Sequence, residues 1–214
     1  MHIRVNKFRF VSLVLMLFIL NSSAQEHPAS KQILFLGNSI TAGLGLKLKQ
    51  AYPALIQDKI DSLKLNYSVI NAGLSGETTS GGLRRIDWLL QKPVDIFFLA
   101  LGANDGLRGI SVELTEKNLK DIIAKVRKKY PRVKIILAGM QIPPNMGPEY
   151  SSQFKKMFID LALAEKVTLL DFLLEGVGGN PDLNQGDGIH PNIMGHKIIA
   201  QNVWRVLKPF ILKK

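Results

Sequence analysis

The chain has 214 residues with a formal net charge of +11, and this length suits one domain with a sizeable hydrophobic core. It contains no cysteine, which excludes a disulfide bond, a thiol nucleophile and a lipid-anchored cysteine. The basic residues form no compact block interleaved with aromatic residues, so we expect no nucleic-acid partner, although such a charge favours transient contact with an anionic membrane surface.

Residues 1–24 have the three-part layout of a secretory signal peptide. A basic stretch over residues 2–9 precedes an apolar run over residues 10–20, and small residues end the segment at Ala24. An uncleaved anchor is the less favoured alternative, because the apolar run has about 11 residues and a membrane-spanning helix needs roughly 20. We therefore expect cleavage after Ala24 and export of a single domain, residues 25–214, to a periplasm or out of the cell.

Short apolar runs rich in β-forming residues alternate with helix-like sequence along the rest of the chain. The runs lack the apolar/polar alternation of a half-exposed sheet, which favours buried parallel strands joined by crossover helices. We predict strands at 33–36, 68–71, 94–101, 134–138 and 167–172, and helices near 55–63, 79–91, 119–126, 150–165 and 192–207. The fold class is therefore α/β, a flavodoxin-like doubly wound sheet of five parallel strands with helices on both faces.

Ligands of doubly wound sheets bind beyond the carboxyl ends of the strands. Three of the predicted strands end in glycine-containing turns that carry Ser39, Gly73 and Asn104. If the strand order is 2-1-3-4-5, these turns are neighbours. Ser39 would then lie at the start of a helix, where free N–H groups and the helix dipole favour negative charge.

A serine hydroxyl needs a base to take its proton, and the base needs a group that orients it. His2 leaves with the signal peptide, His27 lies in the polar lead-in, and His196 lies in helix-like sequence without an evident partner. His190 remains, three residues after Asp187. A turn of that length lets the carboxylate accept from one ring nitrogen while the other nitrogen faces the serine.

Each of these residues also has a purely structural interpretation. Ser39 alone is more typical of a helix N-cap, and Asp187 with the following glycine is typical of a turn. Asp187 and His190 could also ligate a metal, but a site needs three or four ligands and the sequence offers no third candidate. We therefore expect neither a metal nor an organic cofactor, and it is the combination of residues that favours catalysis.

Four segments resemble, in order, the motifs of the SGNH (GDSL-type) hydrolases. They are 36–39 (Leu-Gly-Asn-Ser), 71–73 (Asn-Ala-Gly), 102–106 (Gly-Ala-Asn-Asp-Gly) and 187–192 (Asp-Gly-Ile-His-Pro-Asn). Segments 76–83 and 106–109 are similar to the bacterial secreted lysophospholipase, acyl-CoA thioesterase and arylesterase group in particular. The resemblance covers residues 33–207, which is nearly the whole domain.

This resemblance implies a role for each matching residue. Ser39 would be the nucleophile, His190 its base and Asp187 the residue that orients the base. The Ser39 amide, the Gly73 amide and the Asn104 side chain would form the oxyanion hole. The family usually has aspartate immediately before the nucleophile, whereas this chain has Asn38.

The sequence thus predicts a monomeric serine acyl hydrolase that cleaves small-molecule or lipid acyl esters or thioesters through an acyl-serine intermediate. The apolar residues that we expect to contact substrate are Leu107, Ile110, Ile142, Pro143 and Met146, although they could instead pack against the core. A carbohydrate O-acetylesterase of the same superfamily is an alternative. Two further alternatives are a non-catalytic flavodoxin-like ligand-binding module and a surface-adhesion role driven by basic charge.

Overall fold

A computed structural model of the protein describes residues 29–212, so the predicted signal peptide lies outside the described residues. A five-stranded parallel sheet forms the centre, with strand order β2-β1-β3-β4-β5. The strands are β1 (Lys31–Gly37), β2 (Tyr67–Gly73), β3 (Ile96–Ala100), β4 (Lys134–Ala138) and β5 (Thr168–Leu170). The predicted flavodoxin-like sheet is confirmed.

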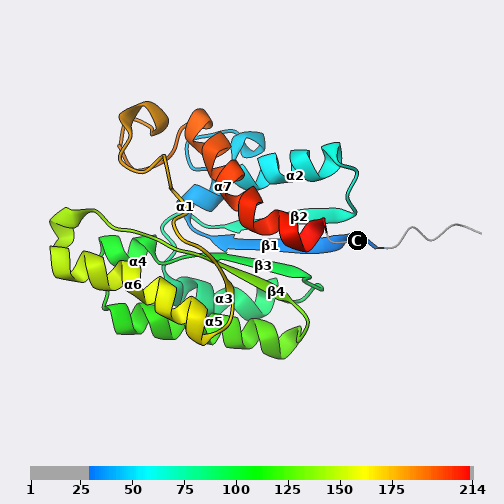
Figure 1. Ribbon diagram of the computed structural model, residues 1–214, viewed down its shortest axis with the longest axis horizontal. Helices are drawn as coiled ribbons and strands as arrows, with labels where there is room; N and C mark the ends of the chain where they lie inside the picture. Colours follow the sequence, from blue (N-terminus) through cyan, green and yellow to red (C-terminus); the bar gives the residue numbers. More distant parts are fainter. Residues whose placement is uncertain (1–28, 213–214) are drawn as a thin grey trace, which may run out of the picture.

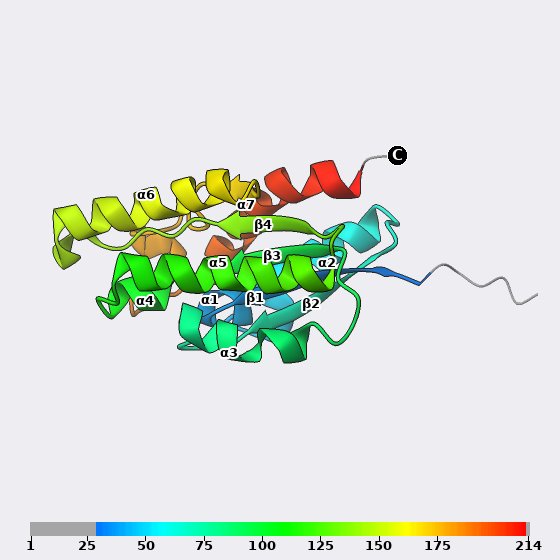
Figure 2. The same ribbon diagram turned by 90° about the horizontal axis from the view of Figure 1, so that it is seen from below.

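Helices cover both faces of the sheet (Figures 1 and 2). Helices α2 (Tyr52–Ser62) and α7 (Ile193–Ile211) lie on one face. Helices α3 (Thr79–Leu89), α5 (Val112–Lys129) and α6 (Pro148–Ala164) lie on the other. Within the described chain no helix is both long and apolar enough to cross a membrane.

The predicted strands and long helices agree with these elements to within a few residues at most ends. Short elements were not predicted in detail, because a single turn carries no measurable apolar period. These are α1 (Ser39–Ala42), α4 (Ala103–Leu107) and the 3₁₀ helices η1 (Leu48–Gln50), η2 (Pro144–Met146) and η3 (Pro181–Leu183).

The hydrophobic core lies on both faces of the central strands. Every residue of β3 is buried, which explains why this strand reads as an unbroken apolar run. The rings of Phe35 and Phe98 pack with their centroids 4.9 Å apart. Burial of each side chain of this size stabilises the fold by about 1.5–3 kcal/mol. The sheet is therefore a stable support for the residues that follow its strands.

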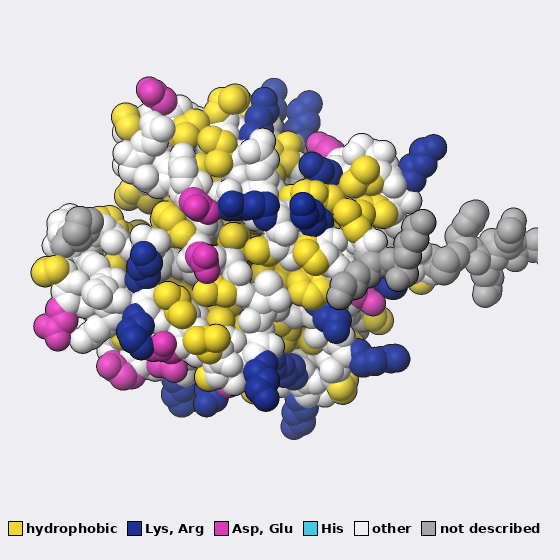
Figure 3. Space-filling view, in the orientation of Figure 1, with side chains coloured by type: hydrophobic (Ala, Val, Ile, Leu, Met, Phe, Trp, Pro, Cys, Tyr) yellow, Lys and Arg dark blue, Asp and Glu magenta, His cyan; other side chains and the backbone are white. Residues whose placement is uncertain are grey.

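Strand register brings three strand ends to one place. Gly37 of β1 is paired with Gly73 of β2 on one side and with Ala100 of β3 on the other. The turns that carry Ser39, Gly73 and Asn104 therefore begin at the same edge of the sheet, as the predicted strand order requires. On the face seen in Figure 3, lysine and arginine side chains are scattered among apolar and neutral ones.

Candidate active site

Ser39 begins the short helix α1 directly after β1. Its side chain lies in a largely enclosed position, with 8% of the residue exposed. Asn38 caps this helix, because its Oδ1 accepts a hydrogen bond from the Ile40 amide at 3.0 Å. Only glycine fits at position 37, because a Cβ there would lie 1.9 Å from Thr41 Oγ1. The turn is therefore tightly packed and fixes the direction of the serine.

His190 and Asp187 lie next to Ser39 although they are about 150 residues away in the sequence. His190 Nε2 is 2.9 Å from Ser39 Oγ, and His190 Nδ1 is 2.6 Å from Asp187 Oδ2. The other carboxylate oxygen, Oδ1, accepts the backbone N–H groups of Ile189 and His190, each at 2.9 Å. The structure thus brings together the three residues predicted to act as nucleophile, base and orienting carboxylate.

The loop before α7 holds this arrangement in place. The Gln185 amide donates to the His190 carbonyl at 2.7 Å, and Asn184 and Pro191 form an isolated β-bridge. Asn192 caps α7 by accepting from the amides of the first helical turn. His190 therefore stands between a closed turn and a capped helix, and its ring position is determined by both.

Hydrogen bonds keep Asp187 ionised, and the 46% exposure of its side chain also favours the charged form. The backbone N–H of His190, its ring and the Ile189 amide hold the pKa of this carboxyl well below its usual range. Because the carboxylate remains charged at neutral pH, it favours the tautomer in which His190 Nδ1 carries the proton. Nε2 is then free to accept the proton of the serine hydroxyl.

Asn104, in α4, lies at the same edge of the sheet as Ser39. One N–H of its side-chain amide donates to the Glu77 carbonyl at 2.9 Å. A primary amide has two donors, so the second remains for another acceptor. The Ser39 backbone N–H also has no acceptor within the described chain. Two of the three predicted oxyanion donors are therefore available.

The third predicted donor is not available in this structure. The Gly73 N–H donates to Asn71 Oδ1 at 2.9 Å, and Asn71 Nδ2 donates to the Thr41 carbonyl at 2.9 Å. A Cβ at Gly73 would lie 2.2 Å from the Ala42 nitrogen. Gly73 thus allows β2 to pack closely against α1, and its predicted role as an oxyanion donor has no support in these contacts.

A neighbouring amide that the sequence interpretation missed is free. Gly76 lies in the exposed loop after β2 with φ of +77°, and its N–H has no acceptor within residues 29–212. Its carbonyl accepts from Arg108 Nη2 at 3.0 Å, and the next residue, Glu77, holds Asn104. The available signal is Gly76, the first of three glycines in segment 76–83, because a glycine in a turn offers an unhindered amide.

His196, the other histidine of residues 29–212, has a structural role. His196 is 1% exposed, and its Nδ1 accepts the Tyr52 amide at 3.1 Å. The Tyr52 hydroxyl in turn bonds with Thr41 Oγ1 at 2.9 Å, behind the helix that carries Ser39. Burial lowers the pKa of His196 to about 4, so the ring is neutral near pH 7. The partner that the sequence did not reveal is a backbone amide of another helix.

The five residues predicted to contact substrate have different surroundings. Leu107 is 38% exposed and Pro143 is also exposed, whereas Ile110 and Met146 are half-buried. Ile142 is 7% exposed and belongs to the core, and Met146 packs against that core, so both residues follow the packing alternative.

An open cavity of about 490 Å³ lies between α1, η1, α2 and β2. It is lined by Ala42, Leu48, Lys49, Pro53, Ala54, Gln57, Val69, Asn71 and Gly73, and so by none of the five predicted residues.

Residues 35–198 match the model of the GDSL-like Lipase/Acylhydrolase family. The chain belongs to this family. It is 39% identical to esterase TesA of Pseudomonas aeruginosa over 87% of this chain and 92% of that protein. It is 36% identical to thioesterase 1/protease 1/lysophospholipase L1 of Escherichia coli K12 over 96% of both chains.

A solved GDSL-type structure is also similar. The psychrotrophic esterase EstA of Pseudoalteromonas sp., inhibited by monoethylphosphonate, superposes with a TM-score of 0.80 at 34% identity, covering 86% of this chain and all of that one. The likeness in sequence and fold extends over nearly the whole described domain. This GDSL-type chain is therefore a serine acyl hydrolase of the esterase and thioesterase type, and the non-catalytic alternatives are not supported.

Proposed function

We propose that this GDSL-type hydrolase acts with Ser39 as nucleophile, His190 as general base and Asp187 as the residue that orients the base. The observation that carries the proposal is the continuous hydrogen-bond chain from Asp187 through His190 to Ser39, with contacts of 2.6 and 2.9 Å. These distances lie within the range needed for proton transfer between a nucleophile and its base.

The reaction has two steps. Ser39 Oγ attacks the acyl carbonyl carbon while His190 Nε2 takes the hydroxyl proton, and the C–O or C–S bond then breaks as the leaving group receives that proton. Water attacks the acyl-serine, gives a proton to His190, and the carboxylic acid departs as Ser39 regains its proton. Both steps balance with water as the only co-reactant of the ester or thioester.

Each tetrahedral intermediate carries an oxyanion, for which we propose three donors. The Ser39 amide and the second N–H of Asn104 are two of them. For the third we propose the Gly76 amide in place of Gly73, because Gly73 already donates to Asn71. A crystal structure of the Ser39 phosphonate adduct would test this, since the phosphonyl oxygen should lie about 2.7–3.1 Å from the Gly76 nitrogen. A contact with the Gly73 nitrogen instead would refute the reassignment.

For the substrate we propose a fatty acyl ester or thioester. The exposed apolar side chains of Leu107 and Pro143, together with half-buried Ile110, suit an acyl chain better than a sugar. Relatives are named as an esterase and as a thioesterase and lysophospholipase, which agrees with this choice. The alternative, an O-acetylesterase acting on carbohydrate, would prefer acetyl esters.

We propose further that residues 1–24 direct export and that the mature enzyme acts as a monomer, in a periplasm or outside the cell. Its basic charge would then favour transient contact with anionic membrane surfaces that present lipid substrates. N-terminal sequencing of protein expressed with its leader tests the processing step, and Gln25 as first residue is the expected result.

Turnover of p-nitrophenyl acyl esters by purified mature protein tests the mechanism. Ser39→Ala should abolish turnover, whereas Ser152→Ala, a change at an exposed serine in α6, should leave the rate unchanged. Rates for acyl chains from acetyl to dodecanoyl then separate the substrate classes. A maximum at medium or long chains supports the proposal, and a maximum at acetyl supports the O-acetylesterase.

A further inference from the structure

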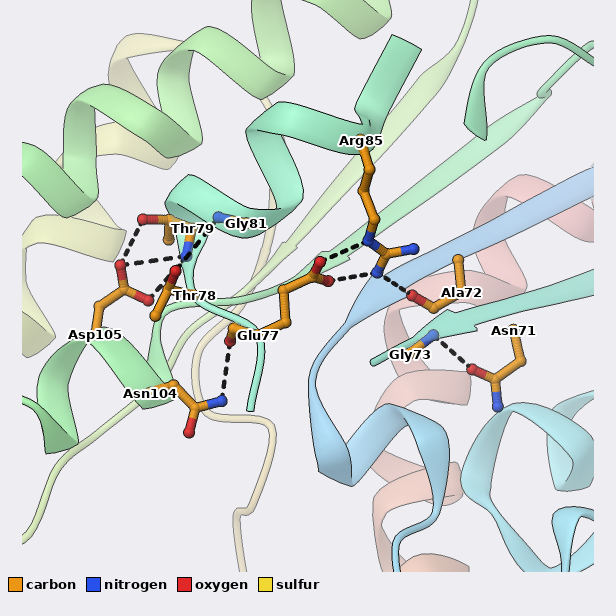
Figure 4. A network of polar contacts seen from close by, with 10 residues as sticks. All are labelled: Asn71, Ala72, Gly73, Glu77, Thr78, Thr79, Gly81, Arg85, Asn104 and Asp105. Atoms are coloured by element: carbon orange, nitrogen blue, oxygen red, sulfur yellow. Dashed lines mark hydrogen bonds and ion pairs between the residues drawn. The ribbon is translucent and has the colours of Figure 1, made fainter. Parts of the chain in front are cut away.

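Glu77 and Arg85 form an ion pair between the loop after β2 and helix α3 (Figure 4). The contact is two-pronged: Arg85 Nε donates to Glu77 Oε1 at 2.5 Å, and Arg85 Nη2 donates to Glu77 Oε2. The side chains are 3% exposed for Glu77 and 23% exposed for Arg85. Burying two charges is costly and is tolerated where the geometry is good and the remaining donors are satisfied.

The same guanidinium also reaches the end of strand β2. Arg85 Nη2 donates to the Ala72 carbonyl at 2.6 Å. Figure 4 shows Arg85 pointing from α3 toward both Glu77 and this carbonyl. One side chain therefore joins helix α3, the end of β2 and the loop that follows the strand.

Glu77 transmits this restraint to Asn104. The backbone carbonyl of Glu77 accepts from Asn104 Nδ2 at 2.9 Å, while its carboxylate is held by Arg85. A side-chain amide is planar, so fixing one of its N–H groups also fixes the direction of the other. The second N–H of Asn104 is the one that stabilises the oxyanion in the proposed mechanism.

A second set of contacts joins Thr79, at the start of α3, to Asp105 of α4 without involving Arg85. Thr79 donates from its backbone N–H to Asp105 Oδ2 at 2.9 Å and from its hydroxyl to Oδ1 at 2.5 Å. The start of α3 would thus remain attached to α4 if the ion pair were lost. The particular contribution of Arg85 is to the position of Glu77 itself.

We propose that Arg85, acting through Glu77, is a positioning residue for the oxyanion hole. It holds the Glu77 carbonyl, and hence the Asn104 amide, in the orientation that meets the developing negative charge. The inference rests on the proposed role of Asn104, and it adds a residue that touches neither substrate nor the reacting serine.

The expected defect lies in the transition state. Without Arg85 the buried Glu77 carboxylate loses its partner and the loop shifts, so Asn104 no longer points at the oxyanion. Loss of one oxyanion donor typically lowers kcat about 10²- to 10³-fold, so partial misorientation should lower it roughly 10- to 100-fold. KM should change less than about threefold, because the contact strengthens only as the charge develops.

A double-mutant cycle with Asn104 tests the proposal. The variants are Arg85→Met, Asn104→Ala and the double variant, with Arg84→Met as control because Arg84 is an exposed arginine on the same helix. Arg85→Lys keeps the charge but not the two-pronged contact, and should lose less activity than Arg85→Met. If Arg85→Met does not fold, Arg85→Lys replaces it in the double-mutant cycle. The readouts are kcat, KM, Tm and the Ki of a boronic acid that mimics the tetrahedral state.

We expect Arg85→Met alone to cause a large loss of kcat and a parallel rise in Ki. In the Asn104→Ala background, the same change should lower kcat by less than about threefold. Equal losses in both backgrounds would overturn the proposal, as would a loss in KM alone or a loss explained by the fraction unfolded. If Asn104→Ala lowers kcat and Arg85→Met does not, only the role of Arg85 fails. If Asn104→Ala has no effect, the proposed oxyanion hole fails too.

Discussion

Asp187 contacts His190 twice, through the ring and through the backbone. Its Oδ2 lies 2.6 Å from the ring Nδ1, and its Oδ1 accepts the backbone N–H of the same histidine at 2.9 Å. A spacing of three residues allows both contacts, because the carboxylate closes the turn that presents the imidazole. One side chain thus fixes the loop, the ring orientation and the tautomer.

Asp187→Asn should keep the size of this side chain but lose its charge and one acceptor. The ring of His190 is then free to adopt the other tautomer, so kcat should fall about 10³- to 10⁴-fold with folding retained. Steady-state kinetics and circular dichroism check this, with Asp182→Asn, at an exposed carboxylate of the same loop, as control. A kcat within threefold of the parent would contradict the role of Asp187.

Asn38 occupies the position at which the resemblance leads one to expect aspartate. Asn38→Asp keeps an acceptor for the Ile40 amide and places a negative charge at a helix start, so the Tm should change little. Asn38→Ala removes the cap and should lower the free energy of unfolding by about 1 kcal/mol. Urea unfolding separates them, and an aspartate variant as unstable as the alanine one would show that the cap is not what this position provides.

His196 makes stability depend on pH. The pKa of His196 is about 4 in the folded protein and near 6.5 in the unfolded chain. The contribution of the neutral ring to the free energy of unfolding is therefore fully present above pH 6.5 and is lost as the pH falls toward 4. His196→Gln can still accept the Tyr52 amide but does not titrate. Between pH 7 and pH 4.5 the parent Tm should therefore fall further than that of the variant. Parallel decreases would argue against a buried neutral histidine.

Two glycines near His190 should differ sharply when changed to alanine. At Gly195 a Cβ would lie 2.3 Å from the Leu183 carbonyl oxygen, whereas at Gly186 it would meet nothing within 4 Å. Gly195→Ala should lower the free energy of unfolding by about 1–3 kcal/mol, because a backbone oxygen cannot easily move. Gly186→Ala should remain within about 0.5 kcal/mol. Comparable effects in denaturant unfolding would contradict the packing at the start of α7.

Much of the fold could be predicted because buried parallel strands read as apolar runs. The run at 134–138 coincides with β4, and the paired ends at Gly37 and Gly73 follow from the expected strand order. Ser39 could be selected because it follows a predicted strand, and His190, with Asp187 beside it, because the chain has only four histidines. Proximity of the three then followed from the topology.

Other features depend on contacts that no sequence pattern carries. The Gly73 amide is not free because Asn71 Oδ1 accepts from it, and no sequence pattern predicts the direction of the Asn71 side chain. Arg85 lies in α3, but Glu77 lies in the loop before it, so the helical spacing rules that predict side-chain pairs do not apply to this ion pair. Ile142 could pack inward or line a pocket with the same sequence, and burial in the core decides this in the structure.

Covalent labelling of Ser39 tests the central claim most directly. The purified mature protein is treated with a fluorophosphonate, and the adduct is located by intact-mass and peptide mass spectrometry. A single adduct on Ser39 that blocks ester turnover, and no adduct on Ser39→Ala, is the predicted result. An adduct on another residue with turnover lost, or full turnover with Ser39 modified, would contradict the assignment of Ser39 as the nucleophile.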